Sequence, residues 1–180
     1  DEDVAQFQLR YLPDGDCAVM MSSATGVEFR NRLRLQLGNQ IYTLSPRPLE
    51  EVCGQIFKDA NLTVAIAESC TAGLVSTRLS AIPGSSRFLM AGFVTYSNQA
   101  KNRQLDIPEV LLERCGAVSP EVALSMARNA LRSANTDLAV SVTGISGPDG
   151  GTKDKPVGTV YMAAVSRRGG ILEYAASFSG

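Results

Sequence analysis

Three apolar runs alternate with helix-forming segments, and this alternation limits the fold more than any other feature of the 180-residue chain. The runs are LTVAIAES (62–69), RFLMAGFVTYS (87–97) and DLAVSVTG (137–144). Nearly continuous apolar strands separated by helices are typical of a parallel sheet that is covered by helices. Residues 158–166 and 171–179, joined by an Arg-Arg-Gly-Gly turn, predict an antiparallel hairpin at its edge. We therefore expect an α/β fold with a mostly parallel sheet.

The segments before and between these runs predict two longer helices with clear sequence signals and several shorter ones. Apolar residues in 49–57 recur at helical spacing, and Ser119-Pro120 supplies an N-cap and an N1 proline for a helix ending near Asn135. Shorter helices are predicted from about Thr71 to Ile82 and in NQAKNRQL (98–105) and PEVLLERCG (108–116).

The first 47 residues have a different pattern. Two alternating apolar stretches on either side of Pro13-Asp14-Gly15 predict a hairpin, VEFRNRLRLQLG (27–38) favours a helix over a strand, and QIYTL (40–44) suggests a short strand. Because residues 45–48 break regular structure, we place a boundary there. Residues 1–47 are expected to form a small α+β segment, and residues 48–180 the main domain.

Composition excludes several classes of function. Seventeen basic and 18 acidic residues leave a net charge of -1, so the broad basic field of a nucleic-acid-binding protein is missing. No apolar run approaches the roughly 20 residues of a membrane span, and no signal peptide is apparent, so we expect a cytoplasmic protein. The four scattered cysteines form no Cys-x-x-Cys pair and suggest neither a zinc site nor a disulfide framework.

The chain contains no histidine. A Ser-His-Asp triad, a Cys-His pair and a histidine-ligated metal site are therefore impossible within it. Any hydrolytic site must use another base.

Candidate chemistry gathers at three predicted strand ends: AESCTAG, VTYSNQAK and VTGISGPDGG. Ligands of α/β sheets bind beyond the carboxyl ends of the strands, so these segments are expected to form one pocket. Ser69 fits either a helix N-cap or a nucleophile, and Cys70 either a small buried side chain or a stronger nucleophile. The backbone amides of Cys70 and Thr71 are candidates for stabilising an oxyanion.

A serine nucleophile needs a base, and Lys101 is a candidate. A lysine accepts a proton only when it is neutral, so its pKa must lie well below the ordinary value of about 10.4. A solvated surface charge is the alternative for Lys101. Tyr96 could relay the proton, or simply bury its ring with its hydroxyl in water.

The loop GISGPDGG (144–151) contains four glycines that could bring backbone amides close to a phosphate or a carboxylate. It matches neither GxGxxG nor the P-loop pattern, so dinucleotide or ATP binding by those motifs is not supported. A connecting loop without a ligand is the alternative.

Five blocks, AESCTAG, GFVTYSNQAK, GAVSPEVA, SVTGISGPDGG and KPVGTVYMA, together resemble the carboxy-terminal domain of the CinA family. The resemblance runs from about Pro48 to Gly180. It implies a three-layer α/β/α sandwich and, as in the family's amidases, conversion of nicotinamide mononucleotide to nicotinic acid mononucleotide and ammonia without metal or cofactor. The partner implied is thus a small pyridine nucleotide; a membrane or nucleic acid is not expected, and a homo-oligomer is compatible with the sequence.

The resemblance also implies roles for particular residues. The nucleophile falls on Ser69, the base on Lys101 and the assisting tyrosine on Tyr96. Substrate-holding positions fall on Thr143 and on the glycine loop, with members Gly144, Gly147, Asp149 and Gly150.

Outside that domain, residues before Pro48 resemble part of the KH-like middle region of full-length CinA proteins, which also have an amino-terminal domain with nucleotide pyrophosphatase activity in some members. The family pattern continues past Gly180 into an arginine-containing segment and a helix, so the resemblance implies a fragment. The alternative function is a non-catalytic nucleotide-binding or assembly module of a larger protein.

Overall fold

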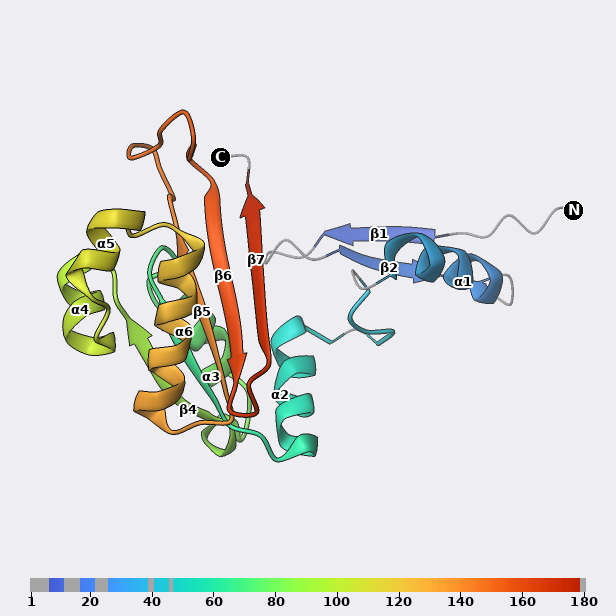
Figure 1. The fold of residues 1–180 in the computed structure, drawn as a ribbon. Helices are drawn as coiled ribbons and strands as arrows, with labels where there is room; N and C mark the ends of the chain where they lie inside the picture. Colours follow the sequence, from blue (N-terminus) through green and yellow to red (C-terminus); the bar gives the residue numbers. More distant parts are fainter. Residues whose placement is uncertain (1–6, 12–16, 22–25, 39–40, 46, 179–180) are drawn as a thin grey trace, which may run out of the picture. The chain divides into compact units, whose positions relative to one another are not determined.

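The computed structural model describes residues 7–11, 17–21, 26–38, 41–45 and 47–178. The chain divides into two compact units, Asp1–Val52 and Cys53–Gly180, and the division falls inside helix α2 (Leu49–Ala60) (Figure 1). The domain boundary expected between residues 47 and 48 stays a prediction.

In the first unit, strands β1 (Phe7–Tyr11) and β2 (Cys17–Met21) form an antiparallel hairpin, and helix α1 (Gly26–Leu37) follows. Both the hairpin and the choice of helix for 27–38 are confirmed. The predicted turn at Pro13–Gly15 lies outside the described residues.

The short strand expected at 40–44 is wrong over residues 41–44, which are irregular in the structure; residue 40 lies outside the described residues. The hydroxyl of Thr43 donates to the Ser45 carbonyl at 3.3 Å and accepts from the Ser45 N–H at 3.1 Å. Such local side-chain bonds offer the backbone an alternative to a sheet ladder.

The second unit contains a five-stranded sheet in the order β4-β3-β5-β6-β7. Strand β3 (Val64–Glu68) lies between β4 (Leu89–Val94) and β5 (Leu138–Gly144) and is parallel to both. Strands β6 (Thr159–Ser166) and β7 (Ile171–Ser177) form the antiparallel edge hairpin. The predicted sheet is confirmed.

Helices cover both faces of this sheet, which makes a three-layer α/β/α sandwich (Figure 1). Helix α6 (Pro120–Ala134), with α4 (Asn98–Leu105) and α5 (Glu109–Cys115), belongs to one core, and α2 and α3 (Leu74–Ser80) to the other. In β3 the alternation of side chains divides the strand between the cores: Ala65 and Ala67 join the first, and Val64 and Ile66 join the second.

Two further sequence predictions concern helix starts. Ser119 caps α6 as expected, since its hydroxyl accepts from the Val122 N–H at 3.3 Å. Helix α3, however, begins at Leu74 and not at Thr71. Ala72 and Gly73 have positive φ angles of 50° and 100°, so the backbone turns in the left-handed region before the helix can start.

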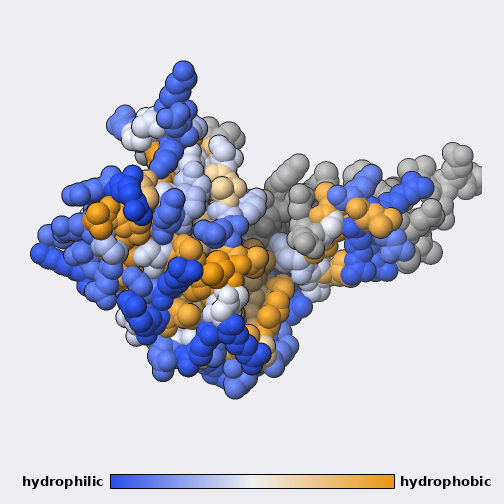
Figure 2. Space-filling model, in the orientation of Figure 1, coloured by the Kyte–Doolittle hydropathy of each residue, from blue (hydrophilic) through white to orange (hydrophobic). Residues whose placement is uncertain are grey.

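Strand β7 forms one edge of the sheet and carries exposed apolar side chains. Leu172 and Tyr174 are 76% and 66% exposed. Figure 2 shows hydrophobic surface over strands β6 and β7.

Among the helices of the described residues, none has both the length and the apolar character that crossing a membrane requires.

Candidate active site

The three chemistry-bearing strand ends meet at the carboxyl edge of the sheet. The Ser69 N–H donates to the Val142 carbonyl at 3.0 Å, and the Thr95 N–H donates to the Glu68 carbonyl at 2.7 Å. A β-carbon on Gly144 would lie only 3.1 Å from Cys70 Sγ. The ends of β3, β4 and β5 are therefore neighbours, as the parallel strands require.

Ser69 and Lys101 form a buried pair at this edge. Lys101 Nζ lies 2.8 Å from Ser69 Oγ and also donates to the Thr95 carbonyl at 2.8 Å. Ser69 is 7% exposed and Lys101 only 1%. Lys101 reaches this position because α4 starts three residues after Thr95, with Ser97 as its N-cap, and turns its first-turn lysine inward.

Burial lowers the pKa of Lys101, and a thiolate at Cys70 would oppose this effect. In the part of the chain that the structure describes, no carboxylate forms an ion pair with the Lys101 amine. No such pair therefore raises the pKa of Lys101 again. A neutral amine can donate one N–H to Thr95 and turn its lone pair toward the Ser69 hydroxyl. This arrangement can remove the serine proton.

The Glu68 carboxylate holds the turn that carries Ser69. One carboxylate oxygen accepts from the N–H groups of Gly73 and Val75 at 3.1 and 3.0 Å. The other accepts from the N–H and hydroxyl of Ser76 at 2.8 and 2.7 Å. Glu68 is fully buried. Glu68 thus takes the capping role that the sequence left open for Ser69, whose hydroxyl faces Lys101 instead.

These bonds also decide the charge of Glu68. Burial raises the pKa of this carboxyl, but the hydrogen bonds from Ser76 and neighbouring amides outweigh burial and lower the pKa overall. Thr71 Oγ1 is shielded from solvent and forms no hydrogen bond of good geometry among the described residues. It still lies near enough to Glu68 to help lower the pKa of that carboxyl. Glu68 is therefore ionised at neutral pH.

Cys70 is a poorer nucleophile here than its side-chain chemistry suggests. Burial raises the pKa of its thiol, and the N–H groups of Cys70 and Thr71 only partly offset this. Both amides therefore lie near the sulfur, and within the described ranges neither donates to a backbone carbonyl. Their role as donors to an oxyanion stays a prediction.

The predicted substrate-binding positions have different environments. Thr143 is fully buried, and its hydroxyl donates to the Ala117 carbonyl at 2.9 Å. A β-carbon on Gly147 would lie 2.6 Å from a methyl group of Val157, so that glycine allows the loop to pack on itself. Asp149 and Gly150 are exposed. A substrate-holding role for these positions stays a prediction.

The structure does not bring Tyr96 into contact with the Ser69–Lys101 pair. Its side chain is 70% exposed, and it has no hydrogen bond to either residue. A role for its hydroxyl stays a prediction.

Two residues of the site escaped the sequence reasoning. The Thr95 carbonyl orients Lys101, and no sequence signal marks a backbone acceptor of this kind. Glu68 did leave a signal, because an acidic residue at the end of an otherwise apolar strand must find several donors when it is buried.

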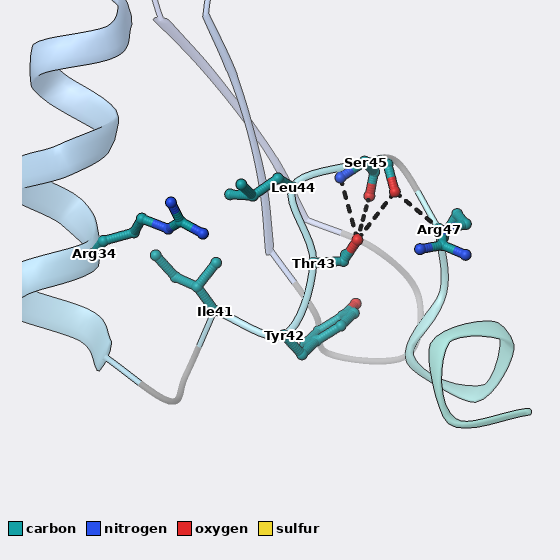
Figure 3. Close-up of a pocket in the computed structure, with 7 residues that line it drawn as sticks. All are labelled: Arg34, Ile41, Tyr42, Thr43, Leu44, Ser45 and Arg47. Atoms are coloured by element: carbon teal, nitrogen blue, oxygen red, sulfur yellow. Dashed lines mark hydrogen bonds between the residues drawn. The ribbon is translucent and has the colours of Figure 1, made fainter. Parts of the chain in front are cut away.

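A pocket of about 470 Å³ lies in the first unit, lined by residues that include Arg34, Ile41 and Arg47 (Figure 3). Arg47 donates to the Ser45 hydroxyl at 3.0 Å, and that hydroxyl also bonds with Thr43 at 3.0 Å. These polar groups satisfy one another and include no pairing of a nucleophile with a base. The chemistry therefore points to Ser69 and Lys101 rather than to this pocket.

Known proteins resemble this chain in sequence and in fold. The family model of the CinA C-terminal domain matches residues 46–180. The chain belongs to the CinA family. A CinA-like protein of Geotalea uraniireducens is 46% identical over 139 residues, which are 77% of this chain and 33% of that protein. One from Geobacter sulfurreducens is 47% identical over 137 residues, 76% of this chain and 33% of that protein.

Solved CinA structures have the same fold. The competence/damage inducible protein CihA from Agrobacterium tumefaciens is 41% identical with a TM-score of 0.71, over 76% of this chain and 85% of that chain. A CinA superfamily protein from Escherichia coli is 34% identical with a TM-score of 0.71, over 80% and 86%. The chain spans about a third of the length of the CinA-like relatives, 33% in both cases above.

Proposed function

We propose that this CinA domain is a Ser-Lys amidohydrolase that converts nicotinamide mononucleotide to nicotinic acid mononucleotide and ammonia. One observation carries the proposal: a serine hydroxyl lies 2.8 Å from the amine of a buried lysine that has no carboxylate partner among the described residues. The choice of substrate comes from the resemblance to the family's amidases.

In the first half of the reaction, neutral Lys101 takes the Ser69 hydroxyl proton as Ser69 Oγ attacks the carboxamide carbon. The carbonyl oxygen becomes negative in the tetrahedral intermediate, and the N–H groups of Cys70 and Thr71 stabilise it. Losing one such donor costs about 3 kcal/mol in other enzymes. Lys101 then gives its proton to the amide nitrogen, the C–N bond breaks, and ammonia leaves an acyl ester on Ser69.

In the second half, Lys101 removes a proton from water while the water oxygen attacks the ester carbonyl. The ester C–O bond breaks, the proton returns from Lys101 to Ser69 Oγ, and the pyridine carboxylic acid is released. Thr95 contributes to both halves of the reaction. Its carbonyl accepts one N–H of Lys101 and so orients the amine while the nitrogen lone pair accepts a proton. The resemblance implies that Tyr96 assists this proton transfer, although its hydroxyl makes no hydrogen bond to Ser69 or Lys101 in the structure.

The test is release of ammonia from nicotinamide mononucleotide by the wild-type chain and by Ser69→Ala, Cys70→Ala and Lys101→Met. We expect loss of turnover for the serine and lysine variants and retention in Cys70→Ala. Activity that survives in Ser69→Ala but not in Cys70→Ala would identify the sulfur as the nucleophile. Thermal stabilisation by the nucleotide with no turnover in the wild type would instead support a non-catalytic nucleotide-binding module.

A further inference from the structure

Each backbone carbonyl of residues 115–118, from the last residue of α5 into the connection to α6, accepts a hydrogen bond from a side chain. Lys155 Nζ donates to the carbonyls of Cys115 and Val118 at 3.1 and 2.8 Å. Ser119 donates to Gly116 at 3.1 Å, and Thr143 donates to Ala117 at 2.9 Å. We name residues 115–118 the carbonyl clasp.

Two of the side chains that donate to the carbonyl clasp come from the segment that ends β5 and leads into β6. Thr143 comes from the end of β5, directly before Gly144. Lys155 comes from the far limb of the connection between β5 and β6, residues 145–158, which contains most of GISGPDGG and which we name the glycine-rich loop. The root of that loop is tied by the Ile145 N–H to the Thr159 carbonyl at 2.9 Å and by the Gly158 N–H to the Ile145 carbonyl at 2.8 Å. Lys155 therefore ties the distal part of the loop to the body of the domain.

The bonding of Lys155 is unusual for a loop lysine. Lys155 is half-buried, and the two acceptors of its amine are neutral backbone carbonyls. One acceptor belongs to the last residue of α5, where the helix dipole favours a cation. Lys153, two residues earlier in the same loop, is exposed and has no such bonds in the part of the chain that the structure describes.

We propose that Lys155 is a positioning residue: it latches the glycine-rich loop onto the carbonyl clasp and so holds the loop in the arrangement that binds substrate. The role of the loop in binding substrate rests on the proposed function. The attachment of the loop by Lys155 is independent of that function, because it concerns only the hydrogen bonds that hold the loop. Removing the ammonium should release the loop without touching Ser69 or Lys101.

The experiment compares Lys155→Met with the matched control Lys153→Met, each in the full chain. Amide hydrogen exchange of peptides covering residues 146–157 is measured first. Hydrogen bonds from a charged group are strong enough that their loss should speed exchange there about tenfold or more in Lys155→Met, and not in Lys153→Met. Lys155→Arg, which keeps a cationic donor, should recover part of the protection.

Kinetics with nicotinamide mononucleotide then tests the link to substrate. For Lys155→Met we expect KM to rise roughly tenfold, equivalent to about 1.4 kcal/mol, with a smaller change in kcat. Equal exchange rates in Lys155→Met and Lys153→Met would overturn the latch. Faster exchange with an unchanged KM would overturn the substrate role of the loop. If the wild type releases no ammonia, the proposed function fails, while the exchange data still decide the latch.

Discussion

Lys101 Nζ lies 2.8 Å from Ser69 Oγ, although 32 positions separate the two residues in sequence. The pairing of β3 with β4 creates this contact, since it places Thr95 beside Glu68 and thus the start of α4 beside Ser69. The lysine is buried with neutral partners, which favours the uncharged amine.

The first prediction concerns Lys101→Met and pH. Because the pKa of Lys101 is lowered in the folded state, kcat/KM of the wild type should rise as pH passes through that lowered value and level off before 10.5. Lys101→Met should lose about 10²- to 10⁴-fold in kcat, the usual contribution of a general base. A pH–rate profile of both proteins measures this.

The same shift makes a stability prediction with a definite sign. Between the lowered pKa and the ordinary value of 10.5, the unfolded chain binds more protons than the folded one. The free energy of unfolding of the wild type should therefore rise with pH relative to Lys101→Met across that window. Urea titrations at several pH values would show it, and a flat difference would mean that the pKa is not lowered.

The second prediction concerns Glu68→Gln. The glutamine amide would face donors where the carboxylate now accepts, so we expect a loss of about 2–4 kcal/mol in unfolding free energy at pH 7. The folded pKa of Glu68 lies below 4.5, so the loss should be complete above pH 4.5 and shrink as pH falls through the lower folded value. Glu113→Gln, an exposed change on α5, is the control and should stay within about 0.5 kcal/mol.

The third prediction concerns Gly144→Ala. The new β-carbon would lie 2.8 Å from Val160 Cγ2, 2.9 Å from the Thr159 carbonyl oxygen and 3.1 Å from Cys70 Sγ. We expect a destabilisation of about 1–3 kcal/mol, measured by chemical unfolding. Adding Cys70→Ala should recover less than half of it, because the contacts with Val160 and Thr159 remain. Full recovery would show that the sulfur alone limits the space.

The fourth prediction concerns Tyr96→Phe. The side chain is 70% exposed and its hydroxyl makes no hydrogen bond to Ser69 or Lys101, so the free energy of unfolding should change by less than about 0.5 kcal/mol. Any fall in kcat would then report a role of the hydroxyl during the reaction. An unchanged kcat and KM would remove Tyr96 from the proposed mechanism.

Much of the fold follows from local patterns. Nearly continuous apolar runs mark β3 and β5 because these central strands are covered on both faces. Strand β4 has a similar run, although it lies at the edge of the sheet and every second residue of it is exposed. The Arg-Arg-Gly-Gly turn marks the β6–β7 hairpin. The errors are local as well. Helix α3 starts late because Ala72 and Gly73 take left-handed angles, and Ile41–Leu44 forms no strand because Thr43 and Ser45 bond with each other. Competition of this kind between side chain and backbone leaves little trace in hydrophobic periodicity.

The sequence by itself determined the α/β class and, through the absence of histidine, the exclusion of every histidine-based mechanism within the chain. It also carried the family resemblance that the comparisons confirm. Only the tertiary structure decided that Lys101 is buried against Ser69, that Glu68 caps the turn, and that Lys155 binds the carbonyl clasp. The physical reason is that periodicity depends on neighbours along the chain, whereas the charge state and partners of a buried polar group depend on residues that strand pairing brings from far away.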